Sequence, residues 1–412
     1  MIPQLKYLPR SSPILTAYLR REIYVSVTFV MIAFVGLFAF FDLIAEVERL
    51  SQDNTNWFFY CVAVILGLPS KVYEIAPIAA LIGSIYALVQ LASTSQFTAI
   101  RAAGIGIWGV VWLMSRIAGG IVLISVLFGE VVAPFAEKAA VPLRAAALGY
   151  EVERDFRSGY WIRDAFTSDS EKTHVRFVNF KDFDNQGRLF NLEFYEFSEN
   201  LKLMRWVRAE EANFDQQLQH WVLTGVVLQR FSTQSNWSGL MPNQGQELFA
   251  SGLISMASLK WQSSLTPNLL TGLFVRPERM SAVQLYNYSN FLESNLQSTQ
   301  NIDLAFAKKI IYPLAIFVMM LISVSFAYLQ FRSGGVSVKV FIGVMIGIGF
   351  YLSNNLFSHL SLVANLPPFV SASIPALVGL VVGLVCLWWV SRPMPLQAIK
   401  QLRKLPEVAI DL

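Results

Sequence analysis

The stretch that decides the fold is IAGGIVLISVLFGEVVAPF, residues 117–135, which is apolar apart from Ser125 and Glu130 and is followed from Glu137 onward by a mixed, soluble-like composition. A helix that crosses a bilayer needs about 20 predominantly apolar residues. We therefore predict a membrane span that ends near Phe135 and a water-facing domain that begins just after it. What lies on either side of this boundary determines how many spans carry the domain.

Five further apolar runs supply the remaining spans. Residues 57–91 are apolar for longer than one span requires, and Pro69 interrupts them, so we expect a short interfacial or kinked segment before the second span. The predicted spans are residues 23–41, 73–91, 117–135, 310–329, 338–360 and 371–390. The fold class predicted from this pattern is an α-helical membrane protein with six transmembrane helices, three before the inserted domain and three after it.

The start of the third span depends on Arg116. A span that began at Ile105 would bury this arginine in mid-membrane, where a cation costs at least about 2.5 kcal/mol. We therefore start the span at Ile117 and interpret residues 93–115, which mix small, polar and aromatic side chains, as interfacial helix on the cytoplasmic side.

The inserted segment, residues 137–303, has the pattern of an all-β domain. Short alternating stretches rich in aromatic and β-branched residues predict antiparallel strands. Turn-forming residues separate them, as in DNQG at residues 184–187. The clearest of these stretches are NLEFYEF at residues 191–197, KLMRWVR at 202–208 and HWVLTGVVL at 220–228.

Charge in the short loops orients the spans, because cytoplasmic loops are enriched in Lys and Arg. The short loops on the opposite side hold only Arg49. We therefore predict that both termini lie in the cytoplasm and the β-domain in the periplasm, and that the basic N-terminus leads into a retained span rather than a signal peptide. The cations on the cytoplasmic side are Lys6, Arg10, Arg20, Arg21, Arg101, Arg116, Arg332, Lys339, Arg392, Lys400, Arg403 and Lys404.

Composition excludes most other classes of protein. Of 412 residues, 54% are hydrophobic and only 15% are charged, which is far from an ordinary soluble domain. Cys61 and Cys386 lie in distant apolar stretches, so neither a disulfide framework nor a metal cluster is indicated. No phosphate-binding loop, His-Glu-x-x-His or Gly-x-Ser-x-Gly motif occurs, so we expect a chain that is not an enzyme and binds no cofactor.

Three stretches resemble the LptF/LptG family of lipopolysaccharide export permeases. They are LPSKVYEIAPIAALIG at residues 68–83, LASTSQFTAIRAAG at 91–104 and GEVVAP at 129–134. The Leu-Pro-x-x-x-Tyr-Glu motif and LPP at residues 366–368 point to the LptG branch. The resemblance covers essentially the whole chain and implies that the periplasmic insert is a β-jellyroll.

The resemblance also implies a coupling helix at residues 93–104 that docks in a groove of a cytoplasmic ATPase. The residues it assigns to this contact are Ser95, Gln96, Phe97, Ile100 and Arg101. The alternative is a plain interfacial linker. Family members usually carry Glu after the serine, whereas this chain has Gln96, which can still form a hydrogen bond but not an ion pair.

For the lipid, the resemblance implies phosphate contacts by Arg144 with Lys138 as a helper, although a solvated arginine at the membrane boundary explains Arg144 equally well. A second basic residue of the family, three before Arg144, is replaced by Val141, and Asp42 stands where the family can carry Lys. Glu130 is an ionisable group near the outer boundary, which suggests a function. A structural partner for a neighbouring span is the alternative.

The reading implied by the resemblance is the permease subunit of an ATP-driven ABC transporter that extracts lipopolysaccharide from the inner membrane and passes it to a periplasmic bridge. Its partners would be an LptF-like permease, an LptB-like ATPase dimer, LptC-like and LptA-like periplasmic jellyroll proteins, and lipopolysaccharide itself. No nucleic acid is expected. Two alternatives remain: a permease for lipoproteins or mechanical coupling, against which the three-plus-three split argues, and a membrane receptor or scaffold whose β-domain binds a periplasmic ligand.

Overall fold

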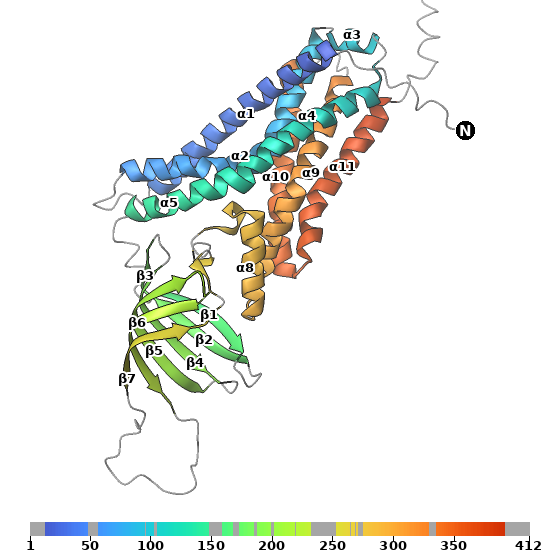
Figure 1. Ribbon diagram of the computed structural model, residues 1–412. Coiled ribbons are helices and arrows are strands. Elements are labelled where there is room, and N and C mark those ends of the chain that lie inside the picture. The colour runs from blue at the N-terminus through green and yellow to red at the C-terminus, as the bar shows by residue number, and fades with distance from the viewer. Residues whose placement is uncertain are drawn as a thin grey trace, which may run out of the picture. The chain divides into compact units, whose positions relative to one another are not determined.

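Figure 1 shows the computed structural model of the chain. The described residues are 13–47, 57–94, 96–102, 105–147, 159–167, 173–184, 188–198, 202–218, 220–231, 253–263, 265–267, 269–270, 275–328 and 335–391.

Helices dominate both ends of the chain, and six of them are long and apolar enough to cross a membrane. This confirms the predicted count of spans and their division around the insert. The helices before the insert are α1 (Pro13–Val47), α2 (Trp57–Ser93), α3 (Gln96–Ala102), α4 (Ile107–Leu127), the π-helical turn η1 (Phe128–Val132) and α5 (Ala133–Ala147). Those after the strands are the 3-10 turn η2 (Pro277–Arg279), α8 (Ala282–Ser294), α9 (Gln300–Tyr328), α10 (Val336–Ala364) and α11 (Pro368–Ser391).

The second helix is longer than predicted. α2 runs unbroken from Trp57 through Pro69, so residues 57–72 form no separate helix, and the alternative of a kink at Pro69 stays a prediction. The hydroxyl of Ser70 donates to the carbonyl oxygen of Gly67 at 2.6 Å, which gives a carbonyl in this turn a side-chain donor. Pro69 itself has no N–H, so the carbonyl of Ile65, four residues earlier, receives no helical hydrogen bond from it, a loss that membrane helices tolerate.

The third helix begins earlier than predicted. α4 starts at Ile107, so the expected interfacial helix at residues 93–115 is divided between the end of α2, the short helix α3 and the first turns of α4. Arg116 is the tenth residue of α4 and its side chain is exposed, and the start of the membrane span at Ile117 stays a prediction. The apolar helix Ile107–Ala140 is 34 residues long, or about 50 Å at 1.5 Å per residue, which exceeds a hydrocarbon core of about 30 Å.

The chain forms two compact units, one of Met1–Gly36, Val72–Val126 and Ile311–Leu412, the other of Leu37–Lys71 and Leu127–Ile310. The core of the first unit is built by α2, α9 and α10, where small residues let the helices approach closely. Cβ atoms placed on Gly343 and Gly347 would meet Ile85 at 2.5 Å and Ile78 at 3.0 Å. The core residues are Leu81, Ile85, Val89, Ala315, Val318, Met319, Ile322, Phe326 and Phe350.

The second unit contains an antiparallel sheet, which confirms the β character of the insert. The strand order is β1-β2-β4-β5-β6-β7. The two-residue strand β3 pairs with β4 and not with β2, and the other described strands follow one another as a meander. The crossovers of the two Greek keys that define a jelly roll are absent from this described sheet. The strands are β1 (Tyr160–Thr167), β2 (Thr173–Phe180), β3 (Asp182–Phe183), β4 (Leu189–Phe197), β5 (Leu203–Asp215), β6 (His220–Arg230) and β7 (Ile254–Trp261).

The insert also contains a helix that the all-β prediction missed. α8 begins with a capping box, in which the Ser281 hydroxyl accepts from the backbone N–H of Gln284 and the Gln284 side chain accepts from the backbone N–H of Ser281. Leu285, Phe291 and Leu292 of α8 join the same buried core as the inner face of the sheet. The helix thus covers apolar side chains of the strands that would otherwise face water.

Four charges form a row across the inner face of the sheet. The strand registers set Asp164 opposite Arg176, Arg176 opposite Glu196 and Glu196 opposite Arg205, so that the signs alternate over β1, β2, β4 and β5. We call this row the charge ladder. Arg176 lies 3.0 Å from Asp164 and 2.7 Å from Glu196, and all three side chains are at most 7% exposed.

The charge ladder is well supplied with hydrogen bonds, which a buried ion pair needs to offset the cost of leaving water. Arg205 donates twice to Glu196, and Ser263 donates to Asp164 at 2.9 Å. Burial by itself would raise the pKa of the Glu196 carboxyl, but the hydrogen bonds and charges of Arg205 and Arg176 outweigh burial and lower this pKa below its ordinary value.

We expect Glu196→Gln to destabilise the protein by about 3 kcal/mol at pH 7, because it removes one charge from a buried pair. A pKa lowered by folding means that the stabilising effect of Glu196 is complete above its ordinary value of 4.5 and is lost as the pH falls through the folded value. Unfolding of the full-length protein in detergent, followed by tryptophan fluorescence, should therefore show wild type and variant converging as the pH is lowered.

Glu193→Gln is the matched control on the same strand, since Glu193 pairs with the half-exposed Arg208 at 3.6 Å on the other face. It should change stability by less than about 1 kcal/mol. An effect of Glu196→Gln that stayed constant with pH would contradict a role for its charge.

Candidate functional site

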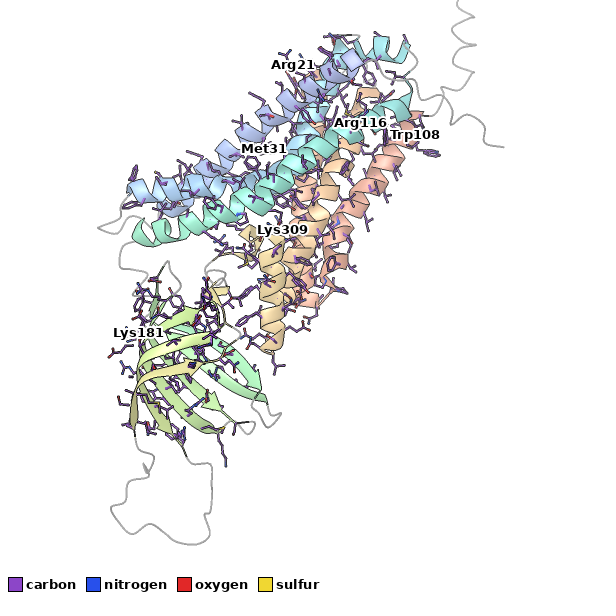
Figure 2. The ribbon with its side chains drawn as sticks, in the orientation of Figure 1. Arg21, Met31, Trp108, Arg116, Lys181 and Lys309 are labelled. Carbon is purple, nitrogen blue, oxygen red and sulfur yellow. The ribbon has the colours of Figure 1, made fainter. Side chains whose placement is uncertain are left out.

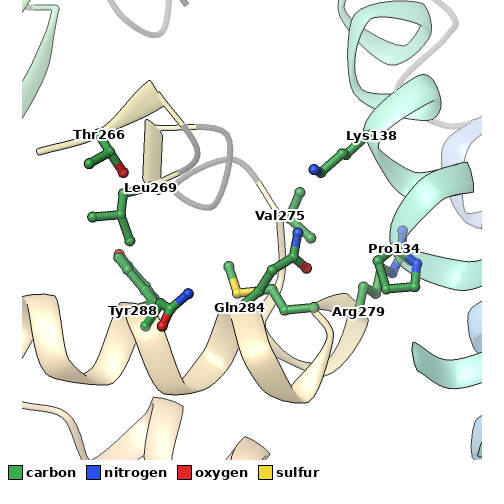
Figure 3. Close-up of a pocket in the computed structure, with 10 residues that line it drawn as sticks. Pro134, Lys138, Thr266, Leu269, Val275, Arg279, Gln284 and Tyr288 are labelled. Atoms are coloured by element: carbon green, nitrogen blue, oxygen red, sulfur yellow. The ribbon is translucent and has the colours of Figure 1, made fainter. Parts of the chain in front are cut away.

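A pocket of about 290 Å³ lies beside α5, lined by side chains from α5, η2, α8 and the segment before η2. Figure 3 shows Lys138 and Arg279 on its border, with the Tyr288 ring at the other end. The pocket combines cations, amides and apolar surface, a mixture that suits an amphiphile with anionic groups. Its lining residues are Pro134, Lys138, Thr266, Leu269, Val275, Arg279, Met280, Gln284, Asn287 and Tyr288.

Of the two cations, Arg279 is neutralised from within the chain. Its guanidinium donates to both carboxylate oxygens of Glu137, at 2.9 and 3.1 Å, and Glu137 is buried. Lys138 is exposed and pairs with no carboxylate among the described residues. Lys138 therefore supplies the net positive charge of the pocket.

Tyr288 closes the pocket on the side of α8. Burial raises the pKa of its phenol, so the hydroxyl stays protonated through the physiological range and can donate a hydrogen bond. The amide side chains of Gln284 and Asn287, from the same helix, are neutral as well.

The structure describes only part of the predicted lipid site. Lys138 lines the pocket, as a residue that contacts lipid should. Arg144 belongs to α5, but its side chain lies outside the described residues, as does that of Val141. The contact of either cation with lipid stays a prediction.

Glu130 lies in the π-helical turn η1 and connects three parts of the second unit. One carboxylate oxygen is 3.2 Å from the Lys309 ammonium of α9, and the other accepts the backbone N–H of Ala282 at the start of α8, at 2.8 Å. Lys309 is buried and also donates to the carbonyl oxygen of Gly129 at 2.8 Å. These contacts favour the structural interpretation of Glu130 as the partner of a neighbouring span.

Sequence reasoning missed Lys309. The signal was available, because Lys308 and Lys309 directly precede the apolar run at residues 310–329, and a cation beside one span needs an anion on another. Arg279 was missed for a different reason, since its partner Glu137 is 142 residues away in the chain.

The predicted coupling helix forms as α3, a short helix between α2 and α4 (Figure 1). Phe97 and Ile100 are buried, and the Phe97 ring meets Tyr328 of α9 edge to face with ring centres 5.0 Å apart. These two side chains hold α3 against its own chain. Gln96 is exposed and accepts a hydrogen bond from the Tyr18 hydroxyl at 3.1 Å.

The outward face of α3 is therefore different from the predicted contact set. Gln96, Ala99 and Ala102 are exposed and follow one another at three-residue spacing, on one face of the helix. Ser95 and the Arg101 side chain lie outside the described residues. Small side chains on this face allow the backbone of another protein to approach closely.

Among the described residues, no group of three or more His, Cys, Asp or Glu could hold a metal ion. The polar groups of the second unit are instead engaged in internal pairs such as Glu137 with Arg279 and Glu130 with Lys309.

Six helices long and apolar enough to cross a membrane, with an antiparallel sheet between the third and the fourth, define a multi-pass membrane protein. Residues 17–389 match the family described as lipopolysaccharide export system permease LptF/LptG, and the chain belongs to this family, in its LptG branch.

Two relatives give the scale of the similarity. The lipopolysaccharide export system permease protein LptG of Haemophilus influenzae is 25% identical over 375 residues, which cover 91% of this chain and 97% of the relative. The protein of the same name from Escherichia coli is 26% identical over 363 residues, or 88% of this chain and 94% of the relative.

We expect Glu130→Gln to lower the melting temperature of the purified protein, because it leaves the buried Lys309 ammonium without its anionic partner, a change that costs about 3 to 5 kcal/mol. Combining Glu130→Gln with Lys309→Met should recover much of the loss, since the buried charge is then gone. Thermal unfolding in detergent measures both.

Glu278→Gln is the control for this pair, because Glu278 is exposed, forms no ion pair among the described residues and lies in the same unit. If the double variant were less stable than Glu130→Gln alone, the Lys309 ammonium would have another role than pairing with Glu130.

Proposed function

We propose that this chain is the LptG-type permease subunit of an ATP-driven transporter that extracts lipopolysaccharide from the inner membrane of a Gram-negative bacterium. The observation that carries the proposal is the family match over residues 17–389, which includes all six candidate spans and the inserted sheet. Two relatives that align with this chain over at least 94% of their own length are named as permease proteins of this export system.

The proposed orientation has both termini in the cytoplasm and the β-domain in the periplasm. Arg20 and Arg21, near the start of α1, support it, together with Arg116 in the first half of α4. These exposed cations fit the excess of Lys and Arg on the cytoplasmic side of bacterial membrane proteins.

The proposed transporter needs partners, because this sequence carries no phosphate-binding loop. An LptF-like permease would complete the lipid cavity, and an LptB-like ATPase dimer would bind and hydrolyse ATP, so that this chain is itself neither an enzyme nor a cofactor-binding subunit. The ATPase would dock on the Gln96, Ala99 and Ala102 face of α3.

The β-domain would pass lipid to LptC-like and LptA-like jellyroll proteins in the periplasm. Among the described strands, β1 and β7 are the ends of the sheet and pair on one side only. An open strand edge is a template for adding a strand from another protein. On β7, Ile254 and Met256 are exposed apolar side chains, which suits such a contact.

Lipopolysaccharide would be contacted at the pocket beside α5. Its phosphates are anionic and its anchor is apolar, and the pocket offers the Lys138 ammonium next to Leu269, Val275 and Met280. Arg144, further along α5, would add a second cation. Charge-assisted contacts to phosphate are roughly twice as strong as neutral hydrogen bonds.

We expect Lys138→Gln to lower the amount of lipopolysaccharide that co-purifies with the complex by about fivefold, because one charge-assisted contact is lost. Mass spectrometry of extracted lipid measures the retained amount. Lys181→Gln is the control, since Lys181 is equally exposed but lines no described pocket (Figure 2). Equal retention by the two variants would exclude Lys138 from the lipid site.

We expect Ala99→Arg to reduce co-purification of the ATPase by at least tenfold, because a long side chain on the exposed face of α3 blocks close docking. Ala364→Arg is the control. Ala364 is also an exposed alanine, but it is the last residue of α10, a helix of 29 residues that begins near the end of α9 and therefore ends far from α3. An ATPase that binds both variants equally would exclude this face of α3.

The experiment that tests the whole proposal is affinity purification of the tagged chain in mild detergent, with bound proteins and lipids identified by mass spectrometry. A second six-span permease, an ATPase and lipopolysaccharide are the expected companions. A chain that carried only bulk phospholipid and no ATPase would overturn the transporter and favour a receptor or scaffold.

A further inference from the structure

A second cavity, of about 380 Å³, lies within the first unit between α1 and α4. It is separate from the pocket beside α5 and shares no residue with it. The lining residues are Thr16, Ala17, Arg20, Tyr24, Leu113, Arg116 and Ile117. Figure 2 labels Arg116 on α4 and Arg21, the neighbour of Arg20, on α1, both toward the same end of these helices.

The charge of this cavity is positive only. Arg20 and Arg116 both contribute to its wall, and none of its described lining residues carries a carboxylate. Neither guanidinium forms a salt bridge with any residue that the structure describes, and both side chains are exposed. Two unneutralised guanidinium groups, each with five N–H donors in a planar fork, suit a phosphate group.

The floor of the cavity is apolar and fixed. Leu113 and Ile117 of α4 are buried, and the Tyr24 hydroxyl of α1 donates to the backbone carbonyl of Ile117 at 3.3 Å. Tyr24 can sit there only because residue 120 is glycine, since a Cβ at Gly120 would come within 2.1 Å of its hydroxyl oxygen. The cavity is therefore held open by the packing of α1 on α4.

The exposed side chains around this cavity are of the kinds typical of a membrane surface. Trp108 and Trp112 are 68% and 61% exposed and precede Arg116 at four-residue spacing, which puts all three on one face of α4. Exposed tryptophans beside arginine are typical of the level of the lipid head groups. Val25, Phe29 and Ile32 are exposed apolar side chains of α1 as well, but they lie on another face of this helix than Arg20.

We propose that this cavity binds the phosphate of an anionic phospholipid of the cytoplasmic leaflet, held by Arg20 and Arg116. Basic pockets between transmembrane helices on this side of a membrane bind anionic head groups. The exposed Trp108 and Trp112 on the same face of α4 as Arg116 favour a lipid over free phosphate, because a free ion gains nothing from apolar side chains. The lipid is distinct from the exported substrate and would occupy a site of its own.

The test is native mass spectrometry of the purified full-length complex with added phosphatidylglycerol, compared with zwitterionic phosphatidylcholine and with inorganic phosphate. We expect saturable binding of one phosphatidylglycerol that millimolar inorganic phosphate does not displace. Arg20→Gln and Arg116→Gln should each weaken binding about fivefold. Arg21→Gln is the matched control, because Arg21 is the exposed neighbour that does not line the cavity.

Two glycines provide a second test that removes no charge. Gly120→Ala should weaken binding by displacing Tyr24, whereas Gly119→Ala should not, because nothing lies within 4 Å of a Cβ at Gly119. Equal binding by Arg116→Gln and Arg21→Gln, or displacement by inorganic phosphate, would overturn the proposal. Since binding is measured directly, these outcomes are independent of whether the chain exports lipopolysaccharide.

Discussion

The ion pair between Glu130 and Lys309 joins the segment just before the inserted domain to the segment just after it. Glu130 belongs to the last turns before the insert, and Lys309 to the first helix after it, yet their charged groups are 3.2 Å apart. The same carboxylate also accepts the N–H of Ala282, so the start of α8 is fixed at this point too. A buried ion pair is costly to form and costly to break, which makes it a strict constraint on the geometry around it. Glu137 and Arg279 form a second ion pair between α5 and η2. Arg279 lines the pocket together with Lys138, so this pair fixes part of the pocket wall.

The sequence predicts the helical part of the fold well because spanning a bilayer imposes length and apolarity, and both are visible residue by residue. It predicts the ends of the helices poorly, because a helix can continue beyond the apolar run from which a span is predicted: α4 begins at Ile107, ten residues before the predicted start of the span. α8 escaped notice although Ser281 and Gln284 have the spacing of a capping box, because the strong strand pattern around it dominated the interpretation. The strand order was likewise beyond the sequence, since alternation indicates strands but not their neighbours.

For the candidate site, resemblance located α3 and α5, but it could not say which way their side chains point. Phe97 is a clear case: an aromatic residue on a docking helix can face the partner or the parent chain, and here it packs on Tyr328. Glu137 and Arg279 are 142 residues apart in the sequence, so no local pattern could have joined them. The charge ladder is different in kind, because its four residues become neighbours as soon as the strands pair in the observed register.

The π-helical turn η1 has one further consequence. A π-turn holds one residue more than an α-helical turn, and each residue of an α-helix advances the side chain by about 100° around the axis. The side chains of α5 are therefore rotated by roughly that angle about the helix axis, compared with an α-helix that lacked the extra residue in η1. The direction of Lys138 is thus encoded in the number of residues between Phe128 and Val132 and not only in their chemistry. In this helix the number of residues, as well as their identity, determines which way a side chain points.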